Sequence, residues 1–150
     1  MDAEKLFKLL KEHKVDFVII GATAFPVHGY ARSTLDVDIF LKPETINVEC
    51  ALIALKAFGY DMTGITFEDL LKKKILIRQY AVETDLHPFV KGVDFEQVWK
   101  NRVRAKFGNT FVYFASLDDL IKMKKAAGRA KDIDDLRVLK EIKRIKRRKK

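Results

Sequence analysis

Residues 35–41, with the sequence LDVDIFL, alternate between aliphatic side chains and a second set that contains two carboxylates. This period of two favours a strand with one buried face, and it places Asp36, Asp38 and Phe40 together on the other face. Residues two apart on a strand have Cα atoms about 6.5–7 Å apart, so both carboxylates leave the sheet at close range. Two like charges this close repel each other unless a cation lies between them. The pattern therefore predicts either a solvated acidic face or a site that holds a cation.

The rest of the chain alternates between segments with strand character and segments with helix character. Strands are expected at 15–20, at 35–41, at 75–87 as one bent strand or two, at 103–107 and at 111–114. Helices are expected at 1–14, 24–28, 43–58, 66–74, 93–101, 116–127 and from about 132 onward. The chain of 150 residues is long enough for one domain with its own core. The order indicates an α/β (α+β) domain in which helices cover a mixed β-sheet and the C-terminus is helical.

The positive charge of the chain is concentrated at its C-terminal end. The 30 Lys and Arg residues against 21 Asp and Glu give a formal net charge of +9. Eight of these cations lie in residues 140–150 beside a single glutamate, so the rest of the chain is nearly balanced. We therefore divide the chain into a domain over residues 1–145 and a basic tail over residues 146–150. Such a tail is either a solvated helix end or a contact for a nucleic-acid backbone or an acidic partner.

Nothing in the sequence calls for an oxidising compartment or a membrane. The single cysteine, Cys50, cannot form a disulfide within the chain, and no Cys/His group has the spacing of a zinc site. The first residues have the pattern of an amphipathic helix rather than of a signal peptide. No apolar run approaches the length of about 18–20 residues that crosses a bilayer. The expected location is therefore the cytoplasm, without membrane contact.

Asp36 and Asp38 have the spacing of a divalent-metal site. Their hard carboxylate oxygens suit Mg²⁺, which keeps several waters and commonly takes further ligands from a substrate phosphate. A site with two metal ions needs a third carboxylate. Asp85, in the strand-like segment VETDLHP, is the first candidate. Glu83 is the second, because it shares the face of Asp85 by the same period of two.

Three motifs together resemble the polymerase-beta-like nucleotidyltransferase superfamily. They are Gly21 to Ala24 (GATA), His28 to Asp38 (HGYARSTLDVD) and Asp85 to Pro88 (DLHP). Within the superfamily the chain looks most like small prokaryotic nucleotidyltransferases, including those of abortive-infection and toxin–antitoxin systems. The stretch from Ser116 to Leu136 is also similar to these proteins.

The resemblance implies a nucleotidyltransferase fold and metal-dependent transfer of a nucleoside monophosphate from a nucleoside triphosphate (NTP) to an acceptor hydroxyl, with release of pyrophosphate. It implies that Asp36, Asp38 and Asp85 are catalytic and hold magnesium, with two ions expected. Ala22 departs from the family pattern, in which Gly or Ser usually follows the first glycine. The rival hypothesis is therefore a catalytically weak or inactive module on the same fold that binds a nucleotide, an RNA or a protein.

The residues expected to bind the nucleotide are Gly21, Ala22, Thr23, Arg32 and Lys124. Gly21 lies between a strand and a short helix, where it lets the backbone come close to a phosphate, and Thr23 offers a hydroxyl nearby. Arg32 either neutralises a phosphate or pairs with Asp36. Lys124 lies within the apolar stripe of its helix, so it needs either an anionic partner, such as a triphosphate, or a route to solvent.

The acceptor is not identified by the sequence and is a protein, an RNA or a small molecule. A chain of this length has little room for an acceptor-binding domain. A partner subunit or a homodimer is therefore expected to build part of the acceptor site.

Overall fold

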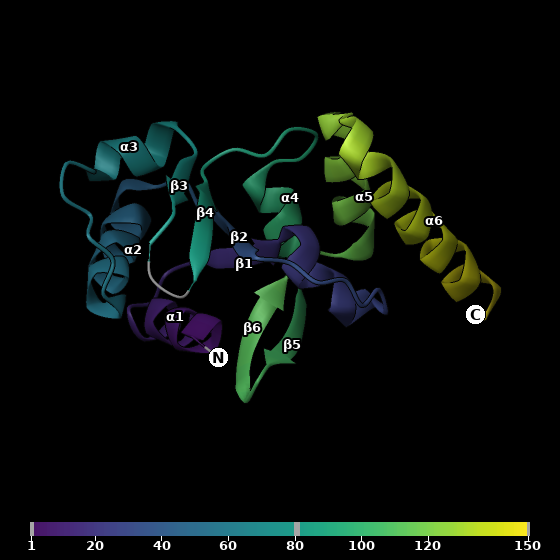
Figure 1. Ribbon diagram of the computed structural model, residues 1–150, viewed down its shortest axis with the longest axis horizontal. Helices are drawn as coiled ribbons and strands as arrows, with labels where there is room; N and C mark the ends of the chain where they lie inside the picture. Colours follow the sequence, from purple (N-terminus) through teal and green to yellow (C-terminus); the bar gives the residue numbers. More distant parts are fainter. Residues whose placement is uncertain (1, 80–81, 150) are drawn as a thin grey trace.

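A six-stranded mixed sheet with the strand order β3-β4-β2-β1-β6-β5 forms the centre of the molecule (Figure 1). The computed structural model describes residues 2–79 and 82–149. The strands are β1 (Phe17–Ile20), β2 (Asp36–Leu41), β3 (Ile75–Ile77), β4 (Glu83–His87), β5 (Val103–Phe107) and β6 (Thr110–Phe114). The β2 strand pairs antiparallel with β1 and parallel with β4, while β1 pairs parallel with β6. The predicted mixed sheet is therefore confirmed.

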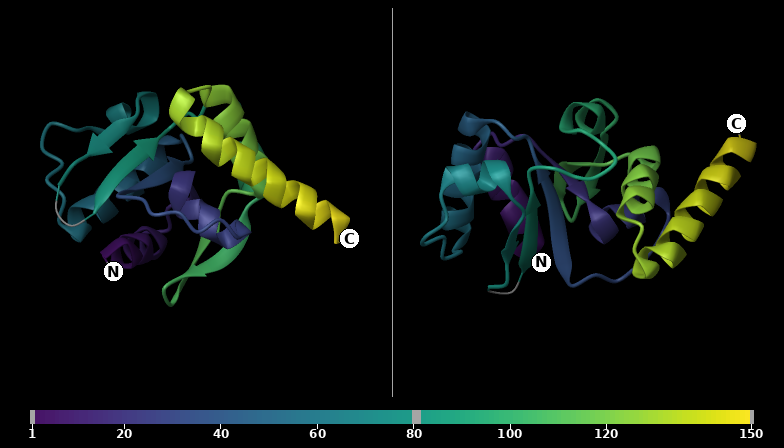
Figure 2. Two further views of the ribbon diagram at one scale, coloured as in Figure 1. Left: turned by 45° about the vertical axis from the view of Figure 1, so that its right-hand side comes forward. Right: turned by 90° about the horizontal axis from the view of Figure 1, so that it is seen from above.

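Helices pack at both ends and on both faces of this sheet. They are α1 (Asp2–Glu12), the 3₁₀ helix η1 (Gly21–His28), α2 (Thr45–Phe58), α3 (Phe67–Lys72), α4 (Phe95–Lys100), α5 (Leu117–Ala127), the 3₁₀ turn η2 (Ala130–Asp132) and α6 (Ile133–Arg148). The α1, α2 and α3 helices pack in succession at one end of the molecule. At the other end α5 lies between α6 and the sheet (Figures 1 and 2). The predicted helical C-terminus is confirmed.

Aromatic side chains fill the core on both faces of the sheet. On one face Phe7 of α1 packs against Phe17 of β1, with ring centroids 6.2 Å apart. On the other face Phe40 of β2 packs edge-on against Phe95 of α4, with centroids 5.2 Å apart. Phe40 shares this second face with Asp36 and Asp38, so the face is apolar at one end of β2 and acidic at the other.

The first residue of the alternating segment lies outside the strand. Leu35 precedes β2 and its surface is 89% exposed, whereas Val37, Ile39 and Leu41 are buried as the period of two predicts. The reason is the length of the neighbouring strand, because β4 begins at Glu83, whose partner is Asp36. Leu35 therefore has no residue of β4 to pair with.

Local signals placed several boundaries correctly. Thr66 and Asp69 form a reciprocal capping box, and the hydroxyl of Ser116 caps α5 by accepting from the N–H of Asp119. Residues 75–87 form two strands, and positions 80 and 81 of that prediction lie outside the described residues.

The predicted basic tail begins within α6. This helix continues through Ile145 to Arg148, so residues 146–148 form its last turn, and position 150 lies outside the described residues. In the part of the chain that the structure describes, none of the helices combines the length and the apolar character needed to cross a bilayer.

Candidate active site

The parallel pairing of β2 with β4 brings the predicted carboxylates together. Asp38 lies directly beside Asp85, and Asp36 lies beside Glu83. Residues paired across neighbouring strands project from the same face of a sheet, so these four acids share one surface. The third carboxylate that sequence reasoning sought in Asp85 is thus adjacent to Asp38 in space. Glu83 lies next to Asp36, two register positions before this pair.

His87 is a member of the acidic site that sequence reasoning did not select. Its Nε2 donates a hydrogen bond to Oδ1 of Asp38 over 2.8 Å. One ligand atom from each of Asp38, Asp85 and His87 lies within 4.8 Å of the other two. The period of two that links Glu83 to Asp85 continues to His87, so the same pattern offered a signal for this residue.

Cationic side chains from β3 and its flanks balance the carboxylates. Arg78 donates a hydrogen bond from Nη1 to Oδ1 of Asp85 over 2.6 Å, and its guanidinium lies 3.9 Å from Asp36 and 3.8 Å from Glu83. The hydrogen bond to Asp85 raises the pKa of Arg78. Lys74 lies 4.0 Å from the other oxygen of Asp85. Sequence reasoning missed Arg78, because its role depends on the antiparallel pairing of β3 with β4.

Gly21 permits Asp38 to occupy its position. It follows β1 with a φ of +68°, and a Cβ added there would lie 2.5 Å from Oδ2 of Asp38. Any side chain at this position would overlap the carboxylate, so the close approach requires glycine. The hydroxyl of Thr23 donates to the backbone carbonyl of Asp36 over 3.4 Å.

Arg32 and Lys124 contact carboxylates that sequence reasoning had not linked to them. Nε of Arg32 lies 3.0 Å from Asp135, so its acidic partner is Asp135 and the predicted alternative of a pair with Asp36 is wrong. Nζ of Lys124 lies 2.9 Å from Asp132 and 3.3 Å from Asp135. Its anionic partners are therefore carboxylates of the chain itself, which join α5 to η2 and α6.

Asp132 is held in its charged form by this network. Burial raises its pKa, but hydrogen bonds from Arg129 and Lys124 outweigh burial and lower the pKa from 3.8 to about 2. Because the pKa in the folded protein lies below the ordinary value, the stabilisation is complete above about pH 4 and is lost as the pH falls towards 2.

The variant Asp132→Asn is expected to lose about 2 kcal/mol of unfolding free energy at pH 7 and much less at pH 2. Urea unfolding at the two pH values measures this difference. Asp134→Asn is the matched control, because the side chain of Asp134 is 81% exposed and its one ion-pair partner among the described residues is the exposed Arg137. An equal loss at both pH values, or an equal loss in the control, would contradict the assignment.

These groups line one cleft of about 710 Å³. The cleft contains all of the predicted site residues except Thr23, and it also contains His87 and Arg78. Lys91 and Lys131 line it too, and neither forms an ion pair among the described residues. The apolar side chains Leu35, Leu76 and Phe89 belong to the same lining and are largely exposed. The lining of the cleft therefore combines carboxylates, two lysines without an ion-pair partner among the described residues, and apolar surface.

A comparison with known families agrees with this arrangement. The model of a family described as a nucleotidyltransferase of unknown function (DUF6036) matches residues 1–147. A search of curated proteins finds no match to the chain. Because the family match spans nearly the whole chain, the protein belongs to this family of nucleotidyltransferases.

Proposed function

We propose that this protein transfers a nucleoside monophosphate from an NTP to an acceptor hydroxyl in a reaction that depends on a divalent metal ion. The observation that carries the proposal is the group of Asp38, Asp85 and His87, whose ligand atoms lie within 4.8 Å of one another in a cleft with free cations. The motifs around Gly21, Asp38 and Asp85 support a place in the polymerase-beta-like superfamily, among small prokaryotic enzymes of the abortive-infection and toxin–antitoxin kind.

The donor set fits a divalent cation. Ligand atoms bound to Mg²⁺ at about 2.1 Å lie at most ~4.2 Å apart. The group of Asp38, Asp85 and His87 is close to this size, so small side-chain movements would close it. Asp36, two residues before Asp38 on the same face of β2, is proposed as a further ligand. When bound, the metal would neutralise charge on the triphosphate and on the attacking oxygen.

The other residues of the cleft position the substrate. Lys91 and Lys131 have no carboxylate partner among the described residues, so they are the cations best placed to bind phosphate oxygens. Arg32 and Lys124 already contact Asp135. We propose that these ion pairs fix the position of α6 beside the cleft, next to the bound phosphates. Phe89, which is 67% exposed, offers a face on which a nucleobase can stack.

The transfer itself needs a base and a leaving group. Asp85 is proposed to accept the proton of the acceptor hydroxyl, because it lines the cleft next to Asp38. The acceptor oxygen then forms a bond to the α-phosphorus, the bond to the bridging oxygen breaks and pyrophosphate leaves. Such chemistry depends on positioning and charge neutralisation more than on covalent help from the protein.

The acceptor that we propose is a protein, an RNA or a small molecule. The described residues form one sheet with its helices and contain no separate domain for an acceptor. We therefore include a partner subunit or a second copy of the chain as the source of the remaining acceptor contacts.

Label transfer tests the proposed activity. The protein is incubated with each α-labelled NTP, Mg²⁺ and separate fractions of protein, RNA and small molecules. We expect label in one acceptor class, no label after chelation of the metal, and none with the variant Asp85→Asn. Failure of every nucleotide and every fraction, or full labelling by Asp85→Asn, would refute the proposed activity.

One observation favours the alternative of a binding module with weak or no catalysis. Arg78 contacts Asp85 at 2.6 Å and lies near Asp36, so a side chain already supplies the positive charge that the carboxylates need. Ala22, at the position where the superfamily usually has Gly or Ser, agrees with this alternative. Calorimetric titration with Mg²⁺ and NTP separates the two functions, because an enzyme must bind both and a module for RNA or protein need bind neither.

A further inference from the structure

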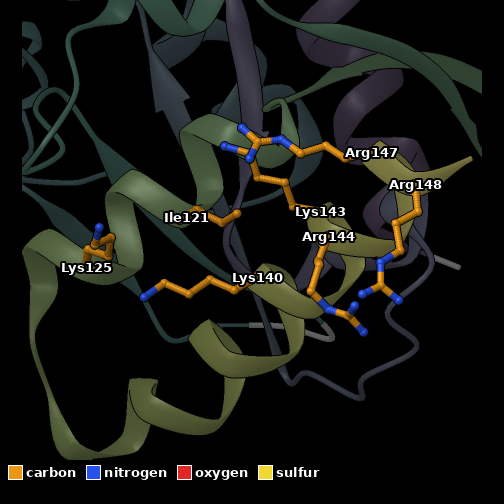
Figure 3. A pocket seen from close by; sticks show the side chains of 7 residues that line it. All are labelled: Ile121, Lys125, Lys140, Lys143, Arg144, Arg147 and Arg148. Carbon is orange, nitrogen blue, oxygen red and sulfur yellow. The ribbon is translucent and has the colours of Figure 1, made fainter. Parts of the chain in front are cut away.

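A second hollow, outside the acidic cleft, is lined almost entirely by cations. It lies between α5 and α6 and has a volume of about 480 Å³ (Figure 3). Its floor includes Ile121 of α5, and its basic side chains are Lys125, Lys140, Lys143, Arg144, Arg147 and Arg148. We call this hollow the basic groove. In Figure 3 the side chains of Ile121 and Lys125 come from α5, and the other basic side chains come from α6.

Only part of the charge in the basic groove is neutralised by ion pairs among the described residues. Asp118 pairs with Lys143 over 2.7 Å, and Glu141 pairs with Arg144. The other four cations form no ion pair among the described residues. Cations three and four residues apart on one helix repel each other. The groove is therefore a concentration of positive charge that an anionic ligand would relieve.

The arrangement of these cations indicates a ligand with repeated charges. The cations of α6 follow the spacing of three and four residues from Lys140 to Arg148, which keeps them on one face over about two turns. The helix dipole favours cations at the last turn, where Arg147 and Arg148 lie, but not at Lys140 in the middle of the helix. A row of this kind can contact several phosphates in succession, whereas a single phosphate would use only part of it.

We propose that the basic groove binds the phosphate backbone of single-stranded RNA. A flexible single strand can follow the hollow along α5 and α6 and bring successive phosphates to Lys125 and to the cations of α6, whereas a stiff duplex or a flat bilayer adapts less to this shape. Arginine also binds phosphate with two parallel hydrogen bonds and stacks on unpaired bases, which suits Arg144 and Arg147 to this ligand. RNA is the abundant single-stranded polyanion of a cell. The proposal stands independently of nucleotidyl transfer.

The test is fluorescence anisotropy with a short, unstructured RNA oligonucleotide, measured with chelator and without NTP. The full chain is compared with the triple variant Lys125→Gln, Lys140→Gln, Arg147→Gln, which removes three cations that have no ion-pair partner in the part of the chain that the structure describes. The logarithm of the affinity falls linearly with the logarithm of the salt concentration, and each lost phosphate contact makes this slope less steep by about 0.7 for a single strand. We expect a slope that is smaller by about 2 and an affinity at low salt that is weaker by about tenfold or more.

The matched control removes the same charge from another part of the surface. Lys5, Lys8 and Lys56 are exposed on α1 and α2, and they are changed to Gln together. The control is expected to keep nearly all of the affinity and salt dependence of the unmodified chain. The proposal is overturned if the groove variant binds RNA as the unmodified chain does, if the control loses as much, or if duplex RNA or anionic vesicles displace the single strand. Because metal and nucleotide are absent, these outcomes do not depend on the proposed enzymatic activity.

Discussion

Replacing Asp38 with asparagine is expected to abolish metal binding and to slow nucleotidyl transfer by about a thousandfold or more. Asp38 is the point at which the site converges, because it lies beside Asp85 and accepts a hydrogen bond from His87 over 2.8 Å. Asparagine has the same size but is neutral and has only one oxygen, so it removes the charge without leaving a cavity. The measurements are calorimetric titration with Mg²⁺ or Mn²⁺ and the rate of pyrophosphate release.

Glu83→Gln is the matched control for this variant. Glu83 lies on the same face of β4 as Asp85 and is paired with Asp36, but it lies outside the group formed by Asp38, Asp85 and His87. Its side chain is 45% exposed, so loss of its charge is well screened by solvent. We expect this variant to keep metal binding and most of the activity. Activity retained by Asp38→Asn, or lost equally in Glu83→Gln, would refute the assignment of Asp38.

The second large effect is expected from Gly21→Ala. An alanine at a φ of +68° is destabilised by roughly 1–2 kcal/mol relative to glycine. Its Cβ would also lie 2.5 Å from Oδ2 of Asp38, so the carboxylate must turn away. We therefore expect loss of metal binding together with reduced stability, measured by calorimetry and by urea unfolding.

Two comparisons separate the overlap from the backbone strain. Gly128→Ala introduces alanine at a similar φ of +61°, with no atom closer than 3.8 Å to the new Cβ, so it reports strain alone. In the double variant Gly21→Ala, Asp38→Ala the overlapping carboxylate is absent, and the added loss from the change at Gly21 should fall to the value seen at Gly128. Normal metal affinity in Gly21→Ala would contradict the proposed contact.

Sequence patterns located the strands and helix caps because these depend on neighbouring residues. The alternation after Leu35 and the capping box at Thr66 are local signals, and the structure contains both of them. Leu35 itself was misplaced, since the end of a strand depends on the length of its partner. That partner, β4, begins more than forty positions later in the chain.

The composition of the site was less accessible because it depends on which strands pair. The roles of His87 and Arg78 follow from the parallel pairing of β2 with β4 and the antiparallel pairing of β3 with β4. No local pattern specifies these partners. Similarly, the position of Lys124 in an apolar stripe offered an anionic partner as one of two alternatives. Only the packing of α5 against η2 and α6 identifies Asp132 and Asp135 as the partners.

The convergence of three chain segments on Asp38 has a consequence for folding. Asp38 meets Gly21 at the end of β1 and Asp85 and His87 on β4, and a long crossover that includes α2, α3 and β3 separates β2 from β4. Such a connection closes slowly, because the chain loses conformational entropy when the loop closes, before the contacts between β2 and β4 stabilise it. The metal group is therefore absent from any partly folded chain in which β4 has not joined β2. A divalent ion that binds this group, as we propose, would select the completed fold, and its concentration would then set part of the stability of the protein.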